Sequence, residues 1–117
     1  TIKKSGSIVF VSSTSSIDGD LGRGAYASTK SALNSIAKVM SRELGNYNIR
    51  VNCIAPGLTN TDMATNNTKK EIIEKVISNT SLKRIAEPEE IANAIIFLLS
   101  DQASYVTGQV IRVDGGI

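Results

Sequence analysis

The 117-residue sequence contains no histidine and a single cysteine, and these two shortages exclude several kinds of active site. Without histidine, the chain cannot supply a Ser-His-Asp or Cys-His catalytic unit or a histidine-based metal site from its own residues. Cys53 alone cannot form an internal disulfide or a cysteine cluster for zinc. Because Cys53 lies in an apolar run, we expect it to be a buried core residue, and we expect no metal site.

Strong charge and long hydrophobic runs are also missing. The net charge is +2, with lysine and glutamate interspersed, so nothing suggests a nucleic-acid partner. The longest apolar run, residues 94–99, is too short to cross a bilayer, and no signal-peptide pattern is present. We therefore expect a cytoplasmic protein without a membrane partner. The length suits one modest domain.

Short apolar runs alternate with longer periodic segments along the chain. The runs predict strands over residues 7–12, 49–55 and 109–113. Apolar residues recurring every three or four positions predict helices over residues 24–44, 69–79 and 88–100. This alternation favours right-handed crossovers, so the expected fold class is α/β, a parallel sheet of about three strands with flanking helices.

Two polar or turn-forming residues are expected to have structural roles. Asn52 is expected to form structural hydrogen bonds rather than to react, and Pro88 is expected in the first turn of the last helix.

Several further details of these elements are also predicted. Residues 14–25 are expected to form a glycine-rich loop, and Thr68 is expected to cap the helix that follows it. Ile36 and Leu99 fall on the apolar faces of their helices and are expected in the core. Residues 58–86 are the candidate mobile segment, and they follow the carboxyl end of a strand, where open α/β sheets bind ligands.

The most informative residues are Tyr26 and Lys30, together with Ser13, which lies thirteen positions before the tyrosine. On a helix, the four-residue spacing puts the phenol and the ammonium on one face, one turn apart. A cation at that place favours the phenolate and lowers a tyrosine pKa from about 10 toward neutrality. Such a tyrosine can exchange a proton with an alcohol or ketone. The trio therefore predicts carbonyl/alcohol redox chemistry that needs a hydride carrier.

The trio and several later motifs together resemble the carboxyl-terminal half of the short-chain dehydrogenase/reductase family. The motifs, in order, are Ser13 with Tyr26-x-x-x-Lys30, Arg50-Val51-Asn52 leading into Pro56-Gly57, Thr61-Asp62-Met63, and Tyr105-Val106-Thr107-Gly108 leading into Asp114-Gly115-Gly116. The resemblance covers essentially the whole chain and implies a Rossmann-like fold. Within the family, the sequences of these motifs are most similar to those of bacterial 3-oxoacyl-acyl-carrier-protein reductases and their close relatives.

The resemblance implies a catalytic role for each member of the trio. Tyr26 would be the general acid/base that protonates the developing alkoxide. Lys30 would bind the ribose hydroxyls of the nicotinamide nucleotide and favour the phenolate. Ser13 would orient the substrate carbonyl, and Ser15 is a second candidate for substrate contact. The alternative for Ser15 is a structural role, in which its side chain forms a hydrogen bond within the loop.

The resemblance also implies contacts with NAD or NADP, and it favours NADP. Pro56, Gly57 and Thr59 would border the nicotinamide together with Tyr26 and Lys30. The family often has an aliphatic residue in place of Thr59, so the implied contact is through its backbone. Thr61 would lie near the carboxamide or the pyrophosphate, with capping of a helix as its alternative role. Residues 62–86 would form a substrate-facing lid.

Chains of this family are about twice as long, and this chain does not begin with methionine. We therefore expect residues 1–117 to be the carboxyl-terminal part of one NAD(P)-binding domain. The absent amino-terminal half would carry the glycine-rich pyrophosphate turn. Gly19, Gly22 and Gly24 do not replace that turn, because they do not form Gly-x-Gly-x-x-Gly. The 117 residues alone are expected to be inactive.

The expected activity is reduction of a 3-oxoacyl thioester with NADPH, and two alternatives remain open. One is a sugar, polyol or other secondary-alcohol dehydrogenase of the same family. The other is a non-catalytic fragment with a structural or associative role. The resemblance also implies a homodimer or homotetramer. The long helix carries a face of small residues that suits either internal packing or a subunit interface: Ala25, Ser28, Ala32 and Ser35.

Overall fold

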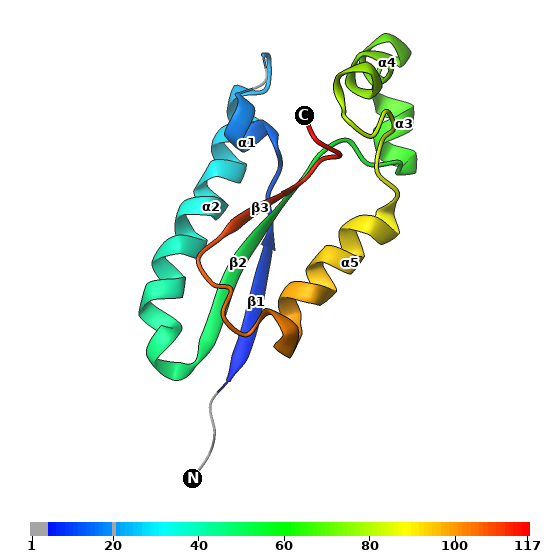
Figure 1. The fold of residues 1–117 in the computed structure, drawn as a ribbon. Coiled ribbons are helices and arrows are strands. Elements are labelled where there is room, and N and C mark those ends of the chain that lie inside the picture. The colour runs from blue at the N-terminus through cyan, green and yellow to red at the C-terminus, as the bar shows by residue number, and fades with distance from the viewer. Residues whose placement is uncertain (1–4, 20) are drawn as a thin grey trace.

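The computed structural model describes residues 5–19 and 21–117 and contains one three-stranded parallel sheet (Figure 1). The strands are β1 (Gly6–Val11), β2 (Ile49–Pro56) and β3 (Val110–Val113), in the order β1-β2-β3. Cys53 of β2 is paired with Phe10 on one side and Val110 on the other. The predicted α/β class with about three parallel strands is confirmed.

Two long helices cover opposite faces of the sheet (Figure 1). Helix α2 (Gly24–Leu44) packs on a cluster that contains Ala37, Val51 and Cys53. Helix α5 (Pro88–Leu99) packs on the other face, where Ile54, Ile91 and Leu98 are buried. Successive residues of β2 thus alternate between two cores, as a strand buried on both faces requires.

The remaining helices are short and lie near the carboxyl ends of β1 and β2 (Figure 1). They are α1 (Ser15–Asp18), α3 (Asp62–Asn67) and α4 (Lys70–Asn79), with 3₁₀ turns η1 (Gly45–Tyr47) and η2 (Asp101–Ala103) elsewhere. Helix α1 corrects the prediction of a loop over residues 14–25. Its single turn holds no apolar repeat long enough to be detected from sequence.

Three finer predictions are also wrong. Thr68 does not cap the next helix; it terminates α3, and Lys69 precedes α4 in an extended conformation. Ile36 and Leu99 are 46% and 48% exposed. The sheet has only three strands here, so each long helix buries a narrower stripe than its apolar pattern suggests.

Two polar side chains of β2 hold the segment that leads into β3. The Asn52 side-chain amide donates to the Val106 carbonyl at 2.9 Å, and its oxygen accepts from Gln109 N at 3.1 Å. Arg50 donates to three backbone carbonyl oxygens, among them that of Leu98 at 2.8 Å. The expectation that Asn52 is a structural hydrogen-bonding residue is confirmed.

Cys53 is fully buried, as expected, and desolvation raises the pKa of its thiol. Its thiol lies 3.5 Å from the Leu33 carbonyl oxygen, within the α2 core. Among residues 5–19 and 21–117, no helix is both long and apolar enough to cross a bilayer.

Candidate active site

The carboxyl end of β1 leads into a buried run of hydroxyl-bearing residues. Ser13 and Ser15 are 8% and 2% exposed, and Ser15 N donates to Ser13 Oγ at 3.2 Å. Ser12 extends the strand pairing, because its N–H donates to the Ile54 carbonyl at 2.7 Å. The Ser13 hydroxyl is thus hydrogen-bonded to Ser15, the first residue of α1, directly beyond the carboxyl end of β1.

Tyr26 and Lys30 lie on the first two turns of α2, beside the end of β1. Lys30 Nζ donates to the Val11 carbonyl at 3.2 Å, and Ser12 Oγ donates to the Lys30 carbonyl at 3.1 Å. Lys30 Nζ lies 5.7 Å from the centroid of the Tyr26 ring. Tyr26 is 41% exposed, so its phenol remains accessible to a ligand.

A second cation also lies against the Tyr26 ring. The Cζ atom of Arg23 is 4.5 Å from the ring centroid. This arginine is the residue that precedes α2. A guanidinium over an aromatic face is attracted by the ring quadrupole. Two positive charges therefore lie close to the aromatic ring that the sequence predicts to be the acid/base group.

Pro56 and Gly57 bring the end of β2 into the same region. Thr14 N donates to the Pro56 carbonyl at 3.2 Å, which joins this turn to the residue after Ser13. Gly57 N donates to the Val113 carbonyl at 3.0 Å. A Cβ added to Gly57 would lie 3.0 Å from Asp114 Cβ, so a larger residue would be crowded here.

The hydroxyl groups of Thr59 and Thr61 both bond to the chain itself. Thr59 Oγ1 donates to the Gly57 carbonyl at 3.0 Å, and Thr59 forms an isolated parallel bridge with Ala86. Thr61 Oγ1 accepts from Ala64 N at 3.1 Å and caps α3. The alternative capping role predicted for Thr61 is confirmed. Because the Thr59 hydroxyl is bonded to the Gly57 carbonyl, contact with a ligand through the Thr59 backbone stays the prediction for this residue.

An ion cluster across the carboxyl ends of β1 and β3 was missed by the sequence reasoning. Both guanidinium ends of Arg112 bond Asp18, at 2.7 and 2.9 Å, while its Nε donates to Asp114 at 2.7 Å. The bonds from Arg112 lower the pKa of Asp18. Burial raises the pKa of Asp114, but bonds from Gly116 N and Arg112 outweigh it and leave a lowered value. Asp18 and Arg112 are 94 residues apart, so no local pattern could reveal the pair.

The described part of the chain holds no cluster of three or more histidine, cysteine or acidic residues arranged for a metal ion. The groups present near the carboxyl end of β1 are a phenol, an ammonium and a serine hydroxyl. These groups can hold and exchange protons with a polarised C–O group.

A family model described as enoyl-(acyl carrier protein) reductase matches residues 1–117. The chain is 46% identical to 3-oxoacyl-[acyl-carrier-protein] reductase FabG of Chlamydia muridarum, over 97% of this chain and 46% of the relative. It is 47% identical to a 3α-hydroxysteroid dehydrogenase of Mediterraneibacter gnavus, over 94% of this chain and 44% of the relative. The chain thus spans about half the length of the curated relatives that it matches.

Solved structures give the same result. A 7α-hydroxysteroid dehydrogenase in complex with NADH and 7-oxo glycochenodeoxycholic acid superposes with a TM-score of 0.92 at 38% identity. The superposition covers 97% of this chain and 44% of that structure. With a family model matching every residue and a fold shared at this level, the chain belongs to the short-chain dehydrogenase/reductase family.

Proposed function

We propose that this chain carries the acid/base groups of an NAD(P)-dependent carbonyl/alcohol oxidoreductase. The observation that carries the proposal is the accessible Tyr26 phenol with Lys30 fixed one turn further along α2. Ser13 lies at the same end of the sheet, held by the first turn of α1. All three residues come from elements whose mutual packing fixes them before a substrate arrives.

The proposed reaction divides its work between these side chains. The hydride for the carbonyl carbon would come from a nicotinamide nucleotide when one is bound. Tyr26 Oη gives its proton to the carbonyl oxygen as negative charge develops there, and the alcohol leaves. Lys30 stabilises the resulting phenolate, which then regains a proton from solvent. Ser13 Oγ donates a hydrogen bond to the carbonyl oxygen and orients it.

The residues present fit the nicotinamide end of such a nucleotide. The Lys30 ammonium has three donors, and the bond to Val11 uses one, so donors remain for ribose hydroxyls. Pro56 and Gly57 would border the nicotinamide, with the Thr59 backbone near its carboxamide. Thr61 would approach the carboxamide or pyrophosphate at the start of α3. The likeness to acyl-carrier-protein reductases favours NADP, whereas one solved relative was captured with NADH.

A 3-oxoacyl thioester is the substrate that we propose first, because several matched relatives carry that name. A second candidate is a sugar, polyol or other secondary alcohol, because a 3α-hydroxysteroid dehydrogenase is as similar to this chain, at 47% identity, as the first reductase is, at 46%. A panel of 3-oxoacyl thioesters, ketosteroids and sugar ketones, each assayed with NADPH and NADH, separates these candidates by kcat/KM. Reduction of ketosteroids alone would overturn the thioester proposal.

We further propose that residues 1–117 form the carboxyl-terminal part of one NAD(P)-binding domain in a cytoplasmic homodimer or homotetramer. The chain covers about half of each relative, which supports this division. In this proposal the pyrophosphate turn belongs to residues outside this segment. The exposed small-residue face of α2 supports association. A non-catalytic fragment is the competing hypothesis, and turnover of a ketone with NADPH by the purified 117-residue monomer would decide against it.

The catalytic assignment is tested by Tyr26→Phe in the complete protein. Loss of the phenolic proton should lower kcat for ketone reduction by about 10²- to 10⁴-fold while the fold is retained. Tyr47→Phe is the matched control, because Tyr47 is 49% exposed and lies at the opposite end of α2. Steady-state kinetics with circular dichroism measure both variants. A Tyr26→Phe enzyme with near-normal kcat would show the assignment to be wrong.

A further inference from the structure

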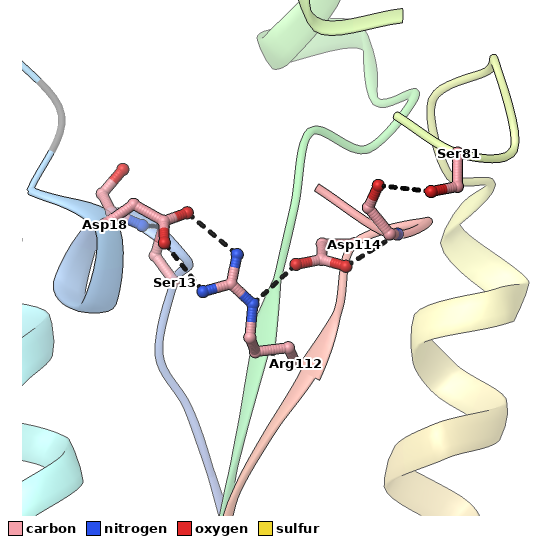
Figure 2. Close-up of polar contacts among 7 residues, drawn as sticks. Ser13, Asp18, Ser81, Arg112 and Asp114 are labelled. Carbon is pink, nitrogen blue, oxygen red and sulfur yellow. Dashed lines mark hydrogen bonds and ion pairs between the residues drawn. The ribbon is translucent and has the colours of Figure 1, made fainter. Parts of the chain in front are cut away.

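The Arg112 side chain lies between two segments that border the candidate site. It projects from β3 toward the α2 layer, since Val110 packs in the α2 core whereas Ile111 and Val113 pack in the α5 core. Figure 2 shows its guanidinium between the carboxylates of Asp18 and Asp114. Each of the three guanidinium nitrogen atoms thus donates a hydrogen bond to an acidic partner.

The geometry of this cluster depends on an arginine. Two parallel bonds, at 2.7 and 2.9 Å, join its Nη atoms to the two oxygens of Asp18. The side chains of Arg112 and Asp18 are 30% and 35% exposed, and that of Asp114 is 8% exposed. A planar fork of donors gives such a pair a defined orientation, which a lysine ammonium does not.

Arg112 binds the helical turn α1, and the same turn is hydrogen-bonded to the Ser13 hydroxyl. Helix α1 is a single turn, and an isolated turn of this length is not stable in water. Its first residue, Ser15, donates to Ser13 Oγ, and its last residue, Asp18, is bound by Arg112. The Ser13 hydroxyl and the Arg112 guanidinium are thus bonded to opposite ends of the same helical turn.

The other arm of the cluster reaches the segment that follows α4. Asp114 accepts from Gly116 N at 2.9 Å, and the Gly116 carbonyl accepts from Ser81 N and Ser81 Oγ at 2.8 and 2.9 Å (Figure 2). Ser81 comes directly after the residue that terminates α4. A single guanidinium thus connects the turn after β1 with the part of the proposed substrate-facing lid that follows α4.

We infer that Arg112 is a positioning residue, which orients the Ser13 hydroxyl through Asp18 and α1. It also connects this hydroxyl, through Asp114 and Gly116, to the segment that follows α4. The inference rests on the proposed function for its catalytic consequence. A displaced hydroxyl would still allow substrate and cofactor to bind, so the loss should fall on kcat.

The test is a double-mutant cycle in the complete protein with Arg112→Met and Ser13→Ala. Arg112→Met should lower kcat for ketone reduction by about tenfold with the KM for the dinucleotide unchanged. If Arg112 acts through Ser13, the same substitution should change kcat by less than about twofold in the Ser13→Ala background. Arg112→Lys keeps the charge without the fork and should remain close to Arg112→Met.

Arg50→Lys serves as the matched control. Arg50 also donates several hydrogen bonds, but it lies near the amino end of β2, away from the site. It should lower the free energy of unfolding without changing kcat or the coupling to Ser13. Equal losses from Arg112→Met in both Ser13 backgrounds, or no loss at all, would overturn the inference while leaving the catalytic role of Ser13 intact.

Hydrogen exchange followed by mass spectrometry supplies a readout that needs no activity. Arg112→Met should speed amide exchange in a peptide covering residues 14–19, and Arg50→Lys should not. Unchanged exchange in that peptide would refute the anchoring itself. Faster exchange in an enzyme whose kcat is insensitive to Ser13→Ala would instead preserve the anchoring, refute its catalytic consequence, and count against the proposed function.

Discussion

At the scale of single residues, Gly57 lies against Asp114, the residue that follows β3. An added Cβ would lie 3.0 and 3.1 Å from Asp114 Cβ and Cα, too close unless the backbone shifts. Gly57→Ala should therefore lower the free energy of unfolding by about 1–3 kcal/mol, and it should also displace Asp114 from Arg112. Urea denaturation of the complete protein measures the change.

Gly45→Ala is the control for that substitution, and its expected sign is opposite. Gly45 has φ −58° and ψ −36°, and a Cβ built there has no neighbour within 4 Å. The alanine restricts the unfolded chain, so it should raise stability by roughly 0.4–1 kcal/mol. Two equal losses would show that the contact with Asp114 is not the cause.

Residues with local signals were the predictable ones. Cys53 in an apolar run, Asn52 inside a strand, and Thr61 ahead of a helix each have the role that sequence neighbours indicate. Arg112 and Asp18 have no such signal, because their partnership arises only when β3 is placed beside the turn after β1. Polar contacts between distant segments follow from topology, so they become predictable only after the fold is known.

At the scale of elements, the start of α5 is fixed by a charged side chain. Glu90 accepts two bonds from Arg84, at 2.5 and 2.8 Å, and one from Glu87 N at 3.0 Å. The Arg84 bonds, followed by the Glu87 N–H, lower the pKa of Glu90 to about 2. Pro88 occupies the first turn, as the sequence predicts.

This lowered pKa gives a pH dependence with a defined sign. A carboxylate whose pKa is lower in the folded state stabilises the fold above its unfolded value and loses that effect as the pH falls. The unchanged protein should thus have a higher thermal midpoint than Glu90→Gln above pH 4.5. This difference should shrink as the pH falls to about 2. Glu89→Gln, at the exposed neighbouring position, is the control. A difference that stays constant with pH would contradict the assignment.

The strands and the long helices were predictable, whereas the shortest helices were not. Helix α2 begins and ends where its apolar repeat indicates, at residues 24 and 44. Helix α1 has only four residues and is stabilised by contacts from elsewhere, so its sequence contains no periodic signal. The cap predicted at Thr68 failed because α3 ends at that residue, and the extended chain there separates two short helices.

At the scale of the whole molecule, the two long helices leave apolar side chains uncovered. Ile96 and Phe97 of α5 are 61% and 45% exposed, and Val39 of α2 is 54% exposed. The outer edge of β1 also has no strand partner within the described part of the chain. Open edges and apolar patches of this kind favour pairing with another chain.

We therefore expect the purified 117-residue chain to self-associate. Light scattering over a wide concentration range should show species larger than a monomer, and Ile96→Lys should raise the monomer fraction because it charges the exposed face of α5. Ile72→Lys, at an exposed position of α4, should have the smaller effect. A monomer at every concentration would contradict this expectation and weaken the proposed homo-oligomer.

The strand order has a consequence for how the chain folds during synthesis. Since β1, β2 and β3 follow one another both in sequence and in the sheet, the β1-α2-β2 unit is complete at Pro56. The second edge of β2 stays open until Val110 has been added. A nascent chain that pauses between these points exposes an edge of β2, the strand with the most buried residues in the finished fold. This is the stage at which a chaperone would be needed.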